Sequence, residues 1–160
     1  MSDRISDKIE DIEAYLKEFE KIIPNDLEDY LNDYLIKVAC ERYFEKIVEA
    51  VVDLTFFVIK KKELKIPEDD TSAFDILAEN KIIDINLGSR LKDAKRMKNI
   101  ISHQYGKISN EIVFNSIKNE LRKDAVEFVD LIERFMKKEL ESSRRKGKNA
   151  LKMKLKYIFG

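Results

Sequence analysis

The scarcity of turn-forming residues is the feature that most limits the folds open to this chain. The 160 residues include four glycines and two prolines, far below the roughly 12 per cent of an average protein. A β-sandwich or barrel needs many tight turns, and glycine and proline are the residues that form them most readily. The chain also has 44% hydrophobic and 39% charged residues, which is enough for one packed core under a charged surface. The sequence therefore predicts an all-α protein.

Hydrophobic residues recur at helical spacing along most of the chain. In residues 5–23 the apolar residues are four or three positions apart, which places their side chains on one face of a helix that Pro24 ends. The same reasoning predicts a long second helix capped by Asn25 or Asp26, a short third, a fourth and a fifth. Their expected ranges are 5–23, 27–58, a short helix over 73–77 capped by Thr71 or Ser72, 85–102 and 110–140. We expect an up-and-down bundle of four to five helices over residues 1–141.

Residues 142–160 form a basic C-terminal extension that differs from the rest. They include seven basic residues and no acidic one, whereas the whole chain has 31 of each, so the bundle is left with a net negative charge. Apolar and basic residues alternate over 150–157, a spacing typical of a strand. The extension is an edge strand, a segment that orders on a partner or RNA, or a frayed end. We expect disorder or partner-dependent order.

Few residues offer chemistry, which excludes several classes of function. The chain has no Cys/His cluster of zinc spacing, no glycine-rich phosphate loop and no Gly-x-Ser-x-Gly elbow, so we expect no metal and no cofactor. The longest apolar run is Phe56–Ile59, too short to span a bilayer, and the start lacks a signal-peptide core. We expect a cytoplasmic protein that does not contact membranes. The single cysteine, Cys40, is on the apolar side of its helix, which indicates a buried hydrophobe rather than a nucleophile.

The single histidine, His103, lies just before Gly106, the glycine that stops the predicted fourth helix. Positions seven apart on a helix lie within about 20° of each other, so Arg96 shares its face and Asn99 lies between them. Such a histidine is either a helix C-terminal cation or a catalyst. Lys98 falls on the stripe of Leu87, Leu91, Ala94 and Ile101. It is therefore a snorkelling surface lysine or a charge held in a cleft.

Residues 98–106, Lys-Asn-Ile-Ile-Ser-His-Gln-Tyr-Gly, resemble the signature of the HEPN family in its HepT-like branch. That signature is Arg-Asn, three mainly apolar residues, His, any residue, Tyr. The Glu41-Arg42 pair, Asp53 in an apolar context, the short helix near 74–77 and the closing helix also match the family's layout, from roughly residue 3 to 140. We read Glu41 and Arg42 as a structural polar pair near the cleft.

The resemblance implies a helical bundle that forms a homodimer, with the two motifs facing a shared cleft. It also implies an activity, that of a metal-independent endoribonuclease. Such an enzyme is the toxin of a toxin–antitoxin pair, and its partner is a small nucleotidyltransferase encoded next to it. RNA is then the substrate.

This chemistry assigns a role to each residue of the motif. Cleaving RNA by its own 2′-OH needs a base, an acid and a cation for the phosphorane. Histidine is the natural acid or base at neutral pH, and because one chain has only His103, two histidines require a symmetric dimer. The family's arginine aligns with Lys98, which keeps the charge but lacks the planar fork. Arg96 also remains admissible, because the wider HEPN pattern allows four to six residues between the arginine and the histidine.

Two further residues match the family signature. Asn99 matches a polar residue that can orient His103. Tyr105 matches the tyrosine that the partner modifies with AMP. The apolar stripe through Leu87, Leu91, Ala94 and Ile101 is more than a helix end needs to bury, which also predicts a dimer near the motif.

Two functions therefore remain open. The first is a ribonuclease toxin, which the intact Asn99, His103 and Tyr105 pattern favours. The second is a non-catalytic helical partner that binds the nucleotidyltransferase, or a nucleotide, through the same cleft. Lys98 in place of arginine favours this second function.

Overall fold

The computed structural model describes residues 3–103 and 109–159, which are helical along most of their length and contain no strand. This confirms the all-α prediction. The four longest helices, α1, α3, α5 and α7, each have at least 19 residues. No helix in the described ranges combines the length and apolar character of a membrane span. The elements are α1 Arg4–Ile22, α2 Leu27–Asn32, α3 Tyr34–Lys61, α4 Asp70–Glu79, α5 Ile85–His103, α6 Asn110–Asn115, the π-helical turn η1 Ser116–Glu120, and α7 Leu121–Phe159.

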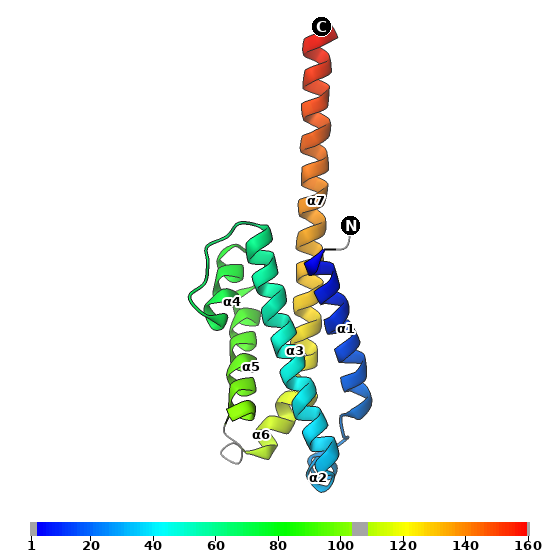
Figure 1. Cartoon of the computed structure of the whole chain (residues 1–160), viewed down its shortest axis with the longest axis vertical. Coiled ribbons are helices and arrows are strands. Elements are labelled where there is room, and N and C mark those ends of the chain that lie inside the picture. The colour runs from blue at the N-terminus through cyan, green and yellow to red at the C-terminus, as the bar shows by residue number, and fades with distance from the viewer. Residues whose placement is uncertain (1–2, 104–108, 160) are drawn as a thin grey trace.

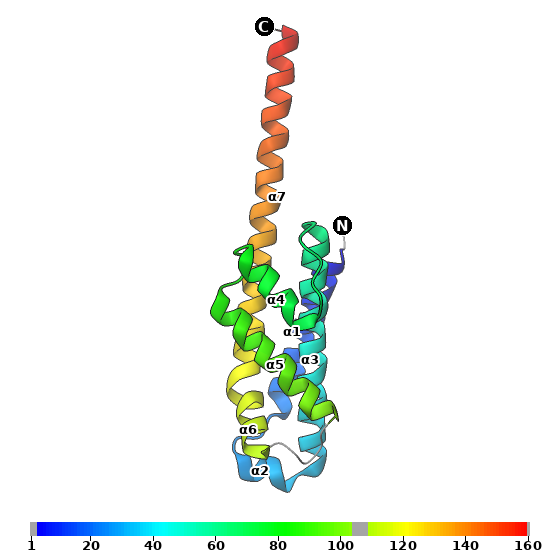
Figure 2. The same cartoon turned by 90° about the vertical axis from the view of Figure 1, so that its left-hand side faces the viewer.

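Successive long helices run in opposite directions, which is the predicted up-and-down arrangement (Figure 1). α1, α3 and the first half of α7 lie side by side, and α5 crosses obliquely on one side of them (Figure 2). Buried aromatic rings join the layers. Phe74 of α4 meets Phe128 of α7 edge to face, with ring centroids 6.4 Å apart, and Phe19 of α1 stacks on Tyr43 of α3.

The predicted second helix is in fact two helices, because Asp33 interrupts it. Asp33 has an extended backbone, with φ −121° and ψ 96°, and its carboxylate accepts a hydrogen bond from the Ile36 N–H at 3.2 Å. An aspartate satisfies a free N–H at a helix start better than it continues a helix. Asp26 caps α2 in the same way, as one of the two predicted caps.

The start of α4 also differs from the prediction. Asp69, rather than Thr71 or Ser72, is the capping residue, and its carboxylate accepts from the Ser72 N–H at 2.7 Å. The Ser72 hydroxyl in turn accepts from the Asp69 N–H at 3.1 Å. Ser72 is thus the third helical residue of a capping box. The hydrogen bonds that the Asp69 carboxylate accepts from Ser72 and Thr71 lower its pKa.

The predicted fifth helix comprises α6, η1 and α7, and it does not end near residue 140. α7 is one helix of 39 residues that continues through the basic extension, so the edge strand and the disordered end are wrong there, and ordering on a partner stays a prediction. Leu151, Met153 and Leu155 alternate with lysines, yet all of these residue types are strong helix formers. Residue propensity therefore prevails over the alternating pattern. The side chains of residues 142–158 are exposed.

An ion pair fixes α5 against α7. The Arg90 guanidinium donates from Nε to Asp124 at 2.9 Å and from a terminal nitrogen to Glu127 at 2.9 Å. The Asp124 side chain is only 7% exposed, and Arg90 is the charged partner that compensates for its burial. The pair holds the helix that carries His103 in its place.

Replacing Asp124 by alanine will lower the free energy of unfolding by about 2 kcal/mol, because Arg90 loses a charge-assisted hydrogen bond to a buried carboxylate. Equilibrium urea unfolding measures this change. Asp130→Ala, which removes an exposed carboxylate from the same helix, is the control and will stay within about 0.5 kcal/mol of the wild type. Equal losses in both variants would contradict the role given to Asp124.

A chain that ends at Glu141 will melt within about 2 °C of the full chain, because the exposed residues 142–158 add little to the buried core. Thermal unfolding followed by circular dichroism is the measurement. A much lower melting temperature would show that the extension packs on the bundle.

Candidate functional site

The helix α5 turns its apolar side into the core of its own chain. Asp84 precedes the helix, and its carboxylate accepts from the Leu87 N–H at 2.8 Å. Leu87, Leu91 and Ile101 are buried, and Ala94 is partly buried. The argument that this stripe pairs two chains is therefore wrong, since a periodic pattern does not distinguish a chain's own core from a partner's surface. A dimer contact requires other residues.

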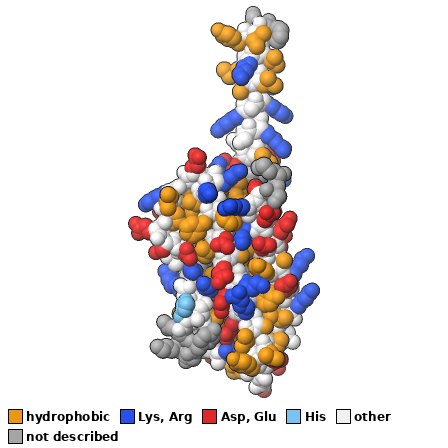
Figure 3. Space-filling model, viewed as in Figure 1, with side chains coloured by type: hydrophobic (Ala, Val, Ile, Leu, Met, Phe, Trp, Pro, Cys, Tyr) orange, Lys and Arg blue, Asp and Glu red, His pale blue; other side chains and the backbone are white. Residues whose placement is uncertain are grey.

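Arg96, Asn99 and His103 share one side of α5, as predicted, and that side faces solvent. Figure 3 shows the histidine exposed near the lower end of the bundle. Arg96 is 59% exposed, and its guanidinium contacts the Asp93 carboxylate at 2.7 Å. The Asn99 carbonyl oxygen accepts from Lys95 Nζ at 3.3 Å. These three side chains form a polar, accessible surface on one side of the helix end.

Lys98 faces a different direction and has an acidic partner. It lies about 140° around the helix from His103, at 100° per residue. Its side chain is 15% exposed, and Nζ lies 3.6 Å from a carboxylate oxygen of Glu49 on α3. The stem of Lys98 is thus buried while its ammonium reaches a carboxylate that is 49% exposed, which fits the predicted snorkelling lysine. Glu49 was not predicted, because a single acidic residue 49 positions before Lys98 gives no local signal.

Glu41 and Arg42 each pair with a neighbour one turn away on α3 rather than with each other. Glu41 accepts from Lys37 at 2.7 Å, and Arg42 lies 3.5 Å from Glu45. Glu41, Arg42 and Glu45 line a hollow of about 450 Å³ together with Tyr34 and Val38. This supports a structural role for the Glu41-Arg42 pair.

Cys40 is fully buried, as predicted. Its thiol donates to the Ile22 carbonyl at 3.9 Å. Burial and the nearby Glu41 carboxylate raise the pKa of the Cys40 thiol to about 11. Because the thiolate is the reactive form, Cys40 is not a nucleophile at neutral pH.

Tyr105 and Gly106 lie outside the described residues. In the described part of the chain, no three His, Cys, Asp or Glu side chains converge as they would around a metal ion.

Comparison with known proteins identifies the family. The family model described as "Ribonuclease HepT-like" matches residues 12–139 of this chain. The chain belongs to the HepT-like family. The match ends before the basic extension begins at residue 142.

Two relatives illustrate the likeness in sequence. The mRNA nuclease HepT of Shewanella oneidensis is 26% identical over 132 residues, which cover 82% of this chain and 98% of the relative. The tRNA nuclease HepT of Aphanizomenon flos-aquae is 25% identical over 113 residues, which cover 71% and 77% of the two chains.

Solved structures show the same fold. The tri-AMPylated HEPN toxin of Shewanella oneidensis, in complex with MNT antitoxin, superposes with a TM-score of 0.77 at 25% identity, covering 84% of this chain and 99% of that one. YutE, a cytosolic protein of unknown function from Bacillus subtilis, superposes with a TM-score of 0.72 at 19% identity, covering 86% and 91%. The bundle is therefore a HEPN fold.

Proposed function

We propose that this protein is a metal-independent endoribonuclease, the toxin of a pair in which a small nucleotidyltransferase is the antitoxin. The observation that carries the proposal is the exposed His103 beside Arg96 and Asn99, at the end of α5 in a HepT-like bundle. The nuclease relatives and the toxin–antitoxin complex support it. Both RNA and such a partner are cytoplasmic molecules, so we expect the activity in the cytoplasm.

The proposed reaction uses the RNA's own 2′-OH as the nucleophile. A neutral His103 imidazole takes the 2′-OH proton while that oxygen attacks the adjacent phosphorus. A protonated His103 from a second chain gives its proton to the departing 5′-oxygen, which leaves a 2′,3′-cyclic phosphate. Each chain supplies one histidine, and the proposal therefore needs a homodimer with a shared cleft.

Arg96 and Lys98 are the two candidates for the cation that stabilises the phosphorane. Alignment with the family signature favours Lys98, and either cation would have to exchange a carboxylate for a phosphate, Lys98 that of Glu49 and Arg96 that of Asp93. Arg96 is more exposed, lies on the side of His103 and has a two-donor fork suited to phosphate. We propose both as site residues, and the geometry favours Arg96.

The surface proposed for the dimer contact is an exposed apolar patch at the start of α3. It comprises Leu31, Tyr34, Leu35 and Val38, of which Tyr34 and Leu35 are 73% and 78% exposed. Hydrophobic side chains are visible at the lower end of the molecule, where α2 and α3 meet (Figure 3). Exposed apolar side chains gathered in this way mark interaction sites.

The patch and the motif are connected through α3. Tyr34, Val38, Arg42, Glu45 and Glu49 are spaced by three or four residues, so they share one side of this helix. Glu49, at the far end of that row, contacts Lys98 on α5. A second chain seated on the patch would therefore lie alongside the motif.

One observation favours the alternative function, a catalytically weak or inactive helical partner of the nucleotidyltransferase. The residue aligned with the family's arginine is a lysine, and it is paired with Glu49. If neither Lys98 nor Arg96 reaches the phosphate, the cleft still offers a surface for a partner.

Sedimentation at micromolar concentration will show a dimer. Leu35→Glu combined with Val38→Glu will give a folded monomer without RNA cleavage, because two charges cannot be buried in an apolar contact. Ile66→Glu, at an exposed position in the loop after α3, is the control and will remain a dimer. A wild-type monomer would rule out the two-histidine reaction.

Single substitutions will rank the site residues by how much RNA cleavage is lost. His103→Ala will abolish RNA cleavage without unfolding the chain, since its side chain is exposed. Arg96→Ala will lower kcat on the order of 10²-fold, as expected for one charge-stabilising group, and Lys98→Ala will cost less. Lys92→Ala, a cation on the same helix paired with Asp75, is the control. Activity will survive EDTA.

Two outcomes of these assays would overturn the assignment. Undiminished cleavage by His103→Ala would remove the proposed base and acid. A wild-type chain that cuts no RNA but binds the nucleotidyltransferase tightly would establish the alternative function.

Tyr105 is the proposed acceptor of AMP from the partner. Tyr105→Phe keeps the ring and removes the hydroxyl, so RNA cleavage will persist while AMP transfer by the nucleotidyltransferase disappears. Intact-mass spectrometry after incubation with ATP and the partner measures the transfer. AMP added to Tyr105→Phe at the wild-type level would contradict the assignment.

A further inference from the structure

The second half of α7 projects beyond every other helix of the bundle. Both views show it continuing past the start of α1 and the end of α3 (Figures 1 and 2). We call residues 142–158 the arm, and all of their side chains are exposed. A helix that packs on nothing in its own chain presents its whole circumference to a partner.

The charge of the arm points to a polyanion. Its seven basic residues have no acidic neighbour within the arm, and in the described structure the ion pairs join residues of the bundle instead. Four of the seven, Arg145, Lys148, Lys152 and Lys156, are spaced by three and four residues. They form one stripe about 16 Å long.

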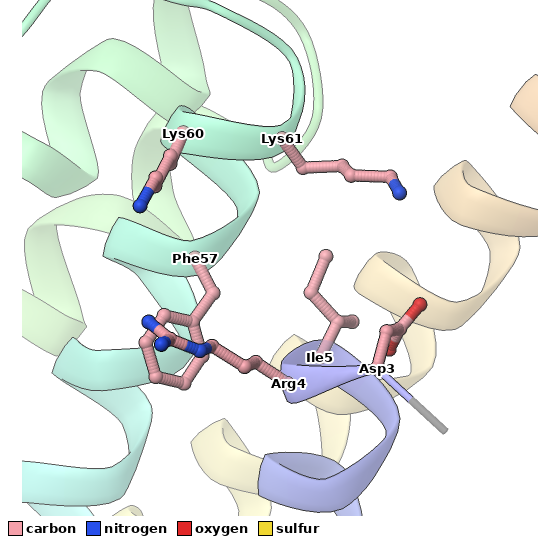
Figure 4. A pocket seen from close by; sticks show the side chains of 6 residues that line it. All are labelled: Asp3, Arg4, Ile5, Phe57, Lys60 and Lys61. Atoms are coloured by element: carbon pink, nitrogen blue, oxygen red, sulfur yellow. The ribbon is translucent and has the colours of Figure 1, made fainter. Parts of the chain in front are cut away.

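The hollow where the arm meets the bundle has a lining of mixed charge. It has a volume of about 710 Å³ and is lined by Lys61, Lys62 and Lys137 together with Asp3 and Glu139, of which Glu139 pairs with Lys62; Ser143, in the first turn of the arm, also lines it. A neighbouring hollow of about 390 Å³ has Arg4, Lys60 and Lys61 around Phe57. Figure 4 shows Arg4 extended across the Phe57 ring, with its guanidinium 5.8 Å from the ring centroid.

We propose that the arm binds the substrate RNA. RNA is taken as the polyanion because of the proposed function, on which this inference rests. Phosphates bind Lys and Arg without regard to sequence, and Tyr157, which is 93% exposed, offers a ring on which a base can stack.

Two other binding partners, a membrane surface and the arm of a second chain, fit the arm less well than RNA does. A helix lying on a membrane needs a continuous apolar face, but residues 142–149 have no large apolar side chain and Lys154 interrupts the apolar side of 150–158. A second arm carries the same seven positive charges, and like charges repel.

The distance between the arm and His103 sets the minimum length of an RNA that can bind both. The arm begins 21 residues after Leu121, which is about 32 Å along α7. His103 lies at the lower end of α5, toward the opposite end of the bundle (Figure 2). An RNA that contacts both must extend over more than about 30 Å, as a folded RNA does and a hexanucleotide does not.

Replacing the four basic residues of the stripe by glutamine tests the proposal. In a His103→Ala background, Arg145→Gln, Lys148→Gln, Lys152→Gln and Lys156→Gln together will weaken binding of a fluorescent tRNA at least about tenfold. They will also reduce the slope of log K against log salt by about 3. The matched control has Lys17, Lys21, Lys65 and Lys81 changed to Gln. These lysines are exposed on the bundle, and the control will bind more tightly than the arm variant.

Cleavage gives a second readout in chains that keep His103. The arm variant will raise KM for the tRNA and leave kcat, and cleavage of a hexanucleotide, unchanged. Far-UV circular dichroism checks that both variants stay helical.

The outcomes separate this inference from the proposed function. A chain that binds RNA through the arm but never cleaves it overturns the nuclease function alone. Equal tRNA binding by the arm variant and its control overturns the arm proposal alone. Binding to phosphatidylglycerol vesicles that is lost in the arm variant, with RNA affinity unchanged, assigns the arm to membranes and also overturns it.

Discussion

The burial of α3 is the constraint on which the rest of the structure depends. Its side chains Phe44, Ile47, Val51, Leu54 and Val58 are almost completely removed from water, and such a helix is stable only when neighbours cover it on several sides. α1, α4, α5 and α7 all contact it. The path of α5, and hence the position of His103, follows from this packing. Glu49 and Lys98 add a polar contact where the same two helices meet.

Most helices were predictable from the sequence because the apolar periodicity and the helix-breaking residues indicate the same helix boundaries. Pro24 follows the end of α1, and the predicted 85–102 differs by one residue from α5. The interruption at Asp33 was missed because apolar residues continue on both sides, at Leu31 and Tyr34. Whether an aspartate caps a helix or sits within one depends on backbone geometry that spacing does not encode.

The site was predictable where it depends on a single helix. The angle between Arg96, Asn99 and His103 follows from 100° per residue, and all three are exposed. The partner of Lys98 was not predictable, since Glu49 meets it only after two helices pack. The stripe through Leu87 and Leu91 was assigned to the wrong surface for the same reason.

The continuity of α7 bears on how the arm forms. An isolated helix of 17 residues is marginal in water, because its first turn fixes many torsion angles for one hydrogen bond. The arm avoids this nucleation step, since the preceding turns are already held by buried residues such as Phe128 and Ile132, and each further residue needs only propagation. Opening should proceed from the part of the arm farthest from the bundle, so amide exchange will slow steadily from Ile158 towards Ser142. A preformed rod of this kind loses less conformational entropy on binding than a flexible tail does.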